Sequence, residues 1–304
     1  WMVAVDPHLA DYDDEQLAFT SFCCNQFPSF DQGEHFVESV ARSRPTLYWP
    51  HARIARATIT RASLLQTPEE KRAELIRAIG ESYAAIALWP EGVGARLNLG
   101  LALMEREELD RAEAVYEPLV AEHPEWAAAW FNLAAIHYRQ GHWEPAMEAI
   151  DRAEQLDPSD PSVHMLRGKI YDEYFQQDGT EESLEVALAS FRKYTEILPD
   201  DWKGYLALGR CLYGGGQLDE GIRVLDQGLD LHPHGHDLRS SKADAYWGKG
   251  EFVTAAEVLA ELLHEFPDDA VGVDLARIFL EEAADSVREE IESLLGDRVP
   301  RGAD

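Results

Sequence analysis

The chain has 304 residues, of which 45% are hydrophobic and 10% aromatic, so it can bury a core and wholesale disorder is excluded. The charge balance of 27 Lys and Arg against 57 Asp and Glu gives a formal charge of −30. Such a surface repels phosphate backbones, which excludes a nucleic-acid reader. The sequence also contains no apolar run long enough to span a bilayer.

Residues 1–48 are predicted to form a helical extension. The acidic run from Asp13 to Glu15 suits the start of one helix, which several phenylalanines would anchor. A second short helix is predicted from about Asp31 to Ser43, between two prolines. We expect this extension to pack on the first of the repeats described below, with folding back onto the array or docking on a partner as alternatives.

Residues 49–92 are predicted to form a helical hairpin. Its second helix starts at Thr67-Pro68-Glu69-Glu70, a capping box with proline at the first helical position, and runs to about Leu88. Its first helix would span about Pro50 to Leu65.

A regular period dominates the rest of the chain. Two series of small residues, starting at Ala78 and Gly100, repeat in step with a series of prolines. The prolines are evenly spaced except for one longer interval, between the third and the fourth: Pro90, Pro124, Pro158, Pro199, Pro233 and Pro267. A period of about 34 residues predicts a stack of similar structural units.

Each unit has the pattern of a helix, a tight turn and a second helix. In residues 127–160, bulky and small residues share one face of a first helix, and Gly141 supplies the turn. Ala134 and Ala146 are small where the two helices are expected to approach each other closely.

These features resemble the tetratricopeptide repeat, whose unit reads W-x-x-L-G-x-x-Y, then A-x-x-x-F, then proline. The resemblance implies an all-α, right-handed α-solenoid of stacked helix-turn-helix hairpins with helical N- and C-terminal caps. Residues 49–92 would be a degenerate hairpin of the same kind, and residues 270–304 the C-terminal capping helices and tail. Five units match: 93–126, 127–160, 161–201, 202–235 and 236–269.

The third unit is seven residues longer than the others. Seven residues are about two helical turns, so each helix is expected to gain about one turn. The tip is expected at Asp178-Gly179, with Thr180 as the next N-cap. After the last unit, residues 270–282 are predicted to form another first helix, and Ser286 is expected to open a final helix that ends near Gly296.

No catalytic motif is present, so we predict neither an enzyme nor a cofactor. The run Gly214-Gly215-Gly216 is interpreted as a hairpin turn. Cys23, Cys24 and Cys211 are interpreted as small buried hydrophobes. His232, His234 and His236 are interpreted as solvated linker residues, with a divalent metal site as the alternative.

The resemblance also implies where a partner would bind, because first helices line the concave groove of such arrays. The groove position of each repeat gives the candidate binding residues Asn98, Leu101, Phe131, Asn132, Tyr138, Arg139, Met165, Lys169, Lys203, Arg210, Tyr213 and Trp247.

Two features single out this groove. Asn98 and Asn132 share one position, similar to the asparagine ladder by which some superhelical repeat proteins hold an extended peptide, although Leu166 ends the series. Four of the scarce cations, Arg139, Lys169, Lys203 and Arg210, also fall on the groove, so the partner segment is expected to be acidic.

Co-chaperones of the family bind acidic chaperone tails through a clamp of lysines, asparagines and an arginine. Only Asn132 matches that clamp, so this function is rejected; the other four clamp positions hold Leu97, Leu101, Ser162 and Leu166.

The sequence therefore predicts a non-catalytic scaffold that binds a protein or peptide segment and supports assembly of a complex. An alternative is the repeat portion of a membrane-associated machine resembling the O-antigen ligases. A hidden hydrolase is a third, weaker interpretation. Compartment and oligomeric state stay open at this point.

Overall fold

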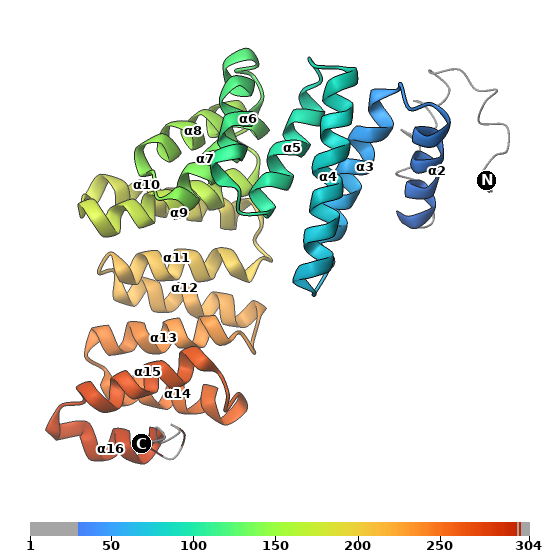
Figure 1. Ribbon diagram of the computed structural model, residues 1–304. Helices are drawn as coiled ribbons and strands as arrows, with labels where there is room; N and C mark the ends of the chain where they lie inside the picture. Colours follow the sequence, from blue (N-terminus) through green and yellow to red (C-terminus); the bar gives the residue numbers. More distant parts are fainter. Residues whose placement is uncertain (1–29, 297, 299–304) are drawn as a thin grey trace. The chain divides into compact units, whose positions relative to one another are not determined.

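The computed structural model describes residues 30–296 and 298, and every regular element in that part of the chain is an α-helix. The all-α prediction is therefore confirmed for these residues (Figure 1). The helices form two compact units, which divide between Leu156 and Asp157. Each unit is described separately.

The first unit contains seven described helices, in which hairpins stack on one another. Helix α2 precedes them, and α3, α5 and α7 are the first helices of successive hairpins. Helix α3 contacts α5, and α5 contacts α7. The second helix of each hairpin also contacts the first helix of the next, α4 with α5 and α6 with α7. The bounds are α2 (Phe30–Ser43), α3 (Tyr48–Leu64), α4 (Pro68–Leu88), α5 (Val93–Glu105), α6 (Leu109–Glu122), α7 (Ala127–Gln140) and α8 (Trp143–Leu156).

The second unit repeats the arrangement. Its first helices α9, α11, α13 and α15 contact one another in order, and we call them the first-helix layer. Helices α11 to α14 lie side by side in Figure 1. The bounds are α9 (Pro161–Asp178), α10 (Glu181–Ile197), α11 (Trp202–Gly214), α12 (Leu218–Leu231), α13 (His236–Lys249), α14 (Phe252–Glu265), α15 (Ala270–Glu282) and α16 (Asp285–Leu295).

The hairpins close where small residues let two helices approach. Ala134 and Ala146 are fully buried in the second repeat. In the third repeat, Gly168 lies under the Phe191 ring, so a Cβ on Gly168 would come within 2.5 Å of Phe191 Cε1. The periodic small residues are thus required by contact between the two helices of each hairpin.

The extra residues of the third repeat lengthen both helices, as predicted. Helix α9 has 18 residues and α10 has 17, whereas α7 and α8 have 14 each. Gly179 ends α9 in the left-handed conformation, with φ of 67°. The Thr180 side chain then caps α10 by accepting a hydrogen bond from the Ser183 amide at 3.4 Å.

A recurring hydrogen bond fastens the linkers to the helices that follow them. In four successive repeats, a side chain near the start of the first helix donates to the carbonyl of the linker proline six residues earlier. The pairs are Trp130 with Pro124 at 3.0 Å, His164 with Pro158 at 2.8 Å, Tyr205 with Pro199 at 3.0 Å and Arg239 with Pro233 at 2.7 Å. The side chain gives the proline carbonyl a hydrogen-bond donor in a linker that has few backbone N–H groups to offer. Because the bond ties the linker to the helix that follows, it helps to fix the direction of that helix.

Three local expectations need correction. Thr67 precedes α4 as predicted, but its hydroxyl donates to Glu70 at 2.5 Å and makes no cap to a backbone amide. The last helix begins at Asp285 with Ala284 as its N-cap, ahead of the predicted Ser286. Helix α2 packs on α3 through Val37, Val40 and Ile54. Within the described residues, α2 thus packs on the degenerate hairpin, and it is α3 and α4 of that hairpin that stack on α5 of the first repeat.

The predicted helix near Asp13 and the residues Cys23 and Cys24 lie outside the described residues. Cys211 is buried, as predicted. Gly216, with φ of 81°, lies in the turn between α11 and α12, as expected for the glycine run. Among the described helices, none combines the length and apolarity needed to cross a membrane.

Candidate partner-binding surface

The two asparagines of the first unit are buried between neighbouring helices. Asn98 is 8% exposed, and its amide donates to the Ala52 carbonyl of α3 at 2.9 Å. Asn132 is also 8% exposed and lies close to the Tyr116 hydroxyl, whose pKa is raised chiefly by burial and which donates to the Leu97 carbonyl at 3.0 Å. Both amides therefore lie against groups of the protein itself, and their role in gripping a peptide stays a prediction.

The predicted apolar residues of the first unit are half-buried on α5 and α7: Leu101, Phe131 and Tyr138. The Tyr138 ring meets Trp143 edge to face, with ring centroids 5.8 Å apart. The Tyr138 ring, held by this contact, therefore offers a fixed apolar surface to a partner.

Arg139 is not the free groove cation that the sequence suggested. Its guanidinium donates to the Met104 carbonyl at 3.0 Å and pairs with Glu107 Oε1 at 2.5 Å. Glu107 is held in a tight turn with φ of 63°, between α5 and α6. Only the folded turn brings this carboxylate to Arg139, so the pairing had no signal in the sequence.

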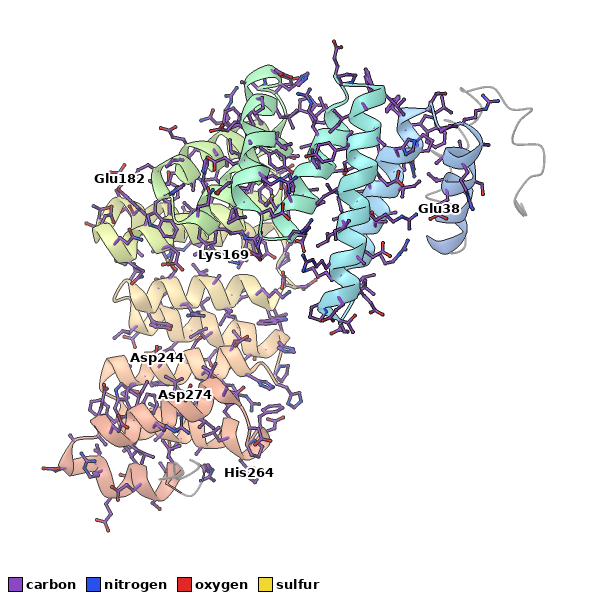
Figure 2. All side chains as sticks on the ribbon, viewed as in Figure 1. Glu38, Lys169, Glu182, Asp244, His264 and Asp274 are labelled. Carbon is purple, nitrogen blue, oxygen red and sulfur yellow. The ribbon has the colours of Figure 1, made fainter. Side chains whose placement is uncertain are left out.

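The second unit keeps two of the predicted cations available. Lys169 on α9 and Lys203 on α11 are exposed, and neither ammonium group forms an ion pair within residues 30–296. Figure 2 labels Lys169 on α9. Met165, one turn before Lys169, is half-buried against the cluster around Phe191. This part of the first-helix layer thus combines positive charge with apolar contact area.

Arg210 belongs to a polar network that crosses three first helices. It lies close to Tyr213 and within electrostatic range of Asp172 on α9. Burial raises the pKa of Asp172, whose carboxylate lies close to the Cys211 thiol. Burial also raises the pKa of Tyr213, and the charge of Asp244 on α13 raises it further. The charge of Arg210 is therefore partly offset from both sides.

Trp247 lies in a packed position on α13. Its ring stacks on Phe279 of α15, with centroids 4.0 Å apart and planes 3° apart. Its indole N–H donates to Glu282 Oε2 at 3.3 Å. Sequence reasoning predicted α15 as another first helix but named no binding residue on it, so it missed Glu282. Helix α15 begins one repeat period after α13, so the same period could have carried the candidate positions onto α15.

The three linker histidines make contacts with three different partners. His232 stacks on Trp202 with ring centroids 4.9 Å apart, His234 pairs with Glu265, and His236 Nδ1 lies 2.9 Å from Asp269 Oδ2. Each histidine therefore contacts a neighbouring side chain, while His234 remains exposed to solvent, as predicted. In the part of the chain that the structure describes, no three metal-ligating side chains converge.

Comparison with models of known protein families identifies the same repeat that the sequence pattern resembles. Two models of the tetratricopeptide repeat match the sequence, one over residues 103–170 and the other over residues 81–124 and 206–270. Together they cover about half of the chain.

Among curated proteins, the mouse protein O-mannosyl-transferase TMTC1 is 26% identical over 162 residues. That match covers 52% of this chain but spans only 16% of the length of the transferase. The likeness therefore concerns the repeats and not the whole of that protein.

Two solved structures share the fold. YrrB, described as a protein of the same repeat class with an unusual peptide-binding site, superposes with a TM-score of 0.54 at 19% identity, covering 64% of this chain and 97% of its own. The anaphase-promoting complex assembly Cut9–Hcn1 gives a TM-score of 0.61 at 16% identity, covering 91% of this chain and 50% of the matched one. At these identities the likeness extends to the fold alone.

Proposed function

The chain belongs to the tetratricopeptide repeat family, and from that premise we propose that it is a non-catalytic scaffold that holds a segment of a protein partner against its first helices. Proteins of this family bind protein or peptide partners, and the stacked hairpins present successive first helices on one surface. Such binding would support assembly of a multiprotein complex.

One observation carries the proposal. Lys169 and Lys203 lie on the neighbouring helices α9 and α11, both are exposed, and neither has an ion-pair partner among the described residues. In a chain with a formal charge of −30, two unneutralised cations on one layer favour an acidic segment and disfavour a basic one.

The half-buried apolar residues beside these lysines support the same proposal. Met165 and Leu206 lie on α9 and α11 and are partly exposed. Apolar contact would supply affinity, while the lysines would supply selectivity and a fast association rate. The peptide-binding site named for YrrB is consistent with this use of the fold.

A charge-reversal experiment tests the proposal. The probe is a fluorescent peptide with two adjacent glutamates in a neutral background, titrated with the whole protein at low salt. The double variant Lys169→Glu/Lys203→Glu is expected to weaken binding by about tenfold or more, since it replaces two attractions by two repulsions.

The matched control reverses two exposed cations on the second helices α10 and α12, through Lys193→Glu and Arg223→Glu. This control makes the same change in net charge and is expected to bind the peptide within about twofold of the unsubstituted protein. Equal weakening by both double variants would remove the first-helix layer from consideration.

A second candidate is the repeat portion of a larger membrane-associated machine. It is favoured by the match to TMTC1, in which the aligned repeats form a small part of a much longer transferase. Sequencing the gene upstream of Trp1 tests it: a hydrophobic span there supports this candidate, and an ordinary start codon with no such span contradicts it.

A further inference from the structure

The sign of the charge changes across the first-helix layer. Helices α9 and α11 carry Lys169, Lys203 and Arg210, together with Asp172 and Glu173. Helices α13 and α15 instead carry the exposed or half-exposed carboxylates Asp244, Asp274, Glu281 and Glu282. Figure 2 labels Asp244 on α13 and Asp274 on α15.

The change of charge occurs at equivalent positions of neighbouring helices. Helices α11, α13 and α15 begin at Trp202, His236 and Ala270, and each start is separated from the next by one repeat period. Arg210 and Asp244 therefore occupy the same position on neighbouring helices. A segment that crosses from α11 to α13 would meet a cation first and a carboxylate next.

The other cations near α13 and α15 are already paired. Lys242 pairs with Asp226 at 2.6 Å, and Lys249 pairs with Asp219 at 2.8 Å and with Glu251. Arg277 pairs with Asp274 at 2.9 Å, and Arg239 pairs with Glu265. These cations pair with carboxylates other than Asp244 and Glu282, and Asp244 lies instead close to Tyr213 of α11.

Trp247 lies between these two carboxylates. Asp244 precedes Trp247 by three residues, so the two side chains share one face of α13. Glu282 accepts a hydrogen bond from the Trp247 indole at 3.3 Å. Stacking on Phe279 and an edge contact with Phe252 at 4.8 Å hold the ring in place, and Trp247 stays partly exposed.

A polar group beneath this face lacks a partner. Ser240 lies one turn before Asp244 on the same side of α13 and is 3% exposed, and its hydroxyl has no hydrogen-bond partner within the described residues. Hydroxyls so buried usually have a partner, so Ser240 marks a polar position on the side of α13 that also carries Asp244.

We propose that Asp244, Trp247 and Glu282 form a subsite for a basic side chain, arginine or lysine, of the bound partner segment. A cation over an indole face is attracted by the ring, and flanking carboxylates add charge-assisted hydrogen bonds. The proposal rests on the proposed function, because the acidic part of the same segment would lie on α9 and α11.

Helix spacing sets the pattern expected in the partner. Packed helices lie about 8 to 10 Å apart, and an extended chain advances about 3.3 Å per residue. The basic residue of the partner is therefore expected about three to six residues from its acidic residues. The preferred segment contains both charges and is not uniformly acidic.

Two peptides test the subsite on the whole protein. One carries two glutamates followed, after about four neutral residues, by arginine, and the other has glutamine in place of that arginine. The arginine peptide is expected to bind about five- to tenfold more tightly. In Asp244→Asn and in Trp247→Leu this gain is expected to fall to less than about twofold, while binding of the glutamine peptide stays unchanged.

The matched control is Glu257→Gln, which removes an exposed carboxylate from the second helix α14 and should keep the full gain. Asp244→Asn keeps the shape of the side chain, so it remains informative if Trp247→Leu fails to fold. An equal affinity for the two peptides, or a gain that persists in Asp244→Asn, would overturn the subsite. If neither peptide bound, the proposed function itself would fail, and the subsite with it.

Discussion

Trp247 of α13 lies flat against Phe279 of α15, with ring planes 3° apart and centroids 4.0 Å apart. Phe279 is fully buried, so this contact joins the last repeat to the capping helices and at the same time fixes the indole of the proposed cation subsite. Stability of the cap and the proposed binding of a cation thus depend on the same pair of rings.

The variant Phe279→Ala is expected to destabilise the protein by about 3 to 5 kcal/mol, because it empties a fully buried aromatic position. Urea unfolding followed by circular dichroism measures the loss. Its neighbour Ile278 is 44% exposed, and Ile278→Ala should change stability by no more than about 0.5 kcal/mol. Similar losses in the two variants would show that the cap is not packed as described.

The variant Gly168→Ala is expected to cost about 1 to 3 kcal/mol, because its new methyl group would lie 2.5 Å from the Phe191 ring. Gly80 on α4 supplies the control, since a Cβ there would meet nothing within 4 Å. Gly80→Ala should stabilise by about 0.5 to 1 kcal/mol through the higher helix propensity of alanine. Thermal unfolding of both variants tests this, and a shift of the melting temperature in the same direction in both would contradict the close approach of Gly168 to Phe191.

The linker hydrogen bonds are testable by removing one hydroxyl group. The Tyr205 hydroxyl donates to the Pro199 carbonyl at 3.0 Å, so Tyr205→Phe should cost about 0.5 to 1.5 kcal/mol. Tyr246 lies on the next first helix, where its ring faces Lys242. Tyr246→Phe keeps that ring and is expected to be close to neutral. Equal effects in urea unfolding would mean that the linker bond contributes nothing specific.

Asp172 should give stability an unusual dependence on pH. Burial raises its pKa in the folded protein, so the folded state binds the proton more tightly than the unfolded state does. This group therefore lowers stability as pH rises from about 4, the ordinary value for an unfolded aspartate, through its folded pKa. Relative to the unsubstituted protein, Asp172→Asn is expected to gain stability over that range.

Asp219 provides the opposite sign as a control. Its pKa is lowered, chiefly by hydrogen bonding to Lys249, so its contribution is present above the unfolded pKa and is lost as pH falls. Asp219→Asn should therefore lose stability, relative to the unsubstituted protein, as pH rises from about 3 to 5. Urea unfolding of both variants between about pH 3 and 5 measures how the stability of each differs from that of the unsubstituted protein. If the two differences changed with pH in the same direction, the opposite pKa shifts assigned to Asp172 and Asp219 would be contradicted.

The regular part of the fold was predictable because its signals are local and repeated. Prolines and small residues at one period mark linkers and close approaches, and the seven extra residues of the third repeat divide between α9 and α10 as helical geometry requires. The site was less predictable. The positive charge of Arg139 is offset by Glu107, which lies in a turn, and that of Arg210 by Asp172, which lies on another helix. These contacts form only when the chain folds, so the sequence pattern did not show them.

The most direct test of the central claim is hydrogen–deuterium exchange of the whole protein with and without the peptide that carries two glutamates and an arginine. We predict slower exchange in α9, α11 and α13, around Lys169, Lys203 and Asp244, with little change in α10, α12 and α14. Protection confined to the second helices of the hairpins would contradict the account.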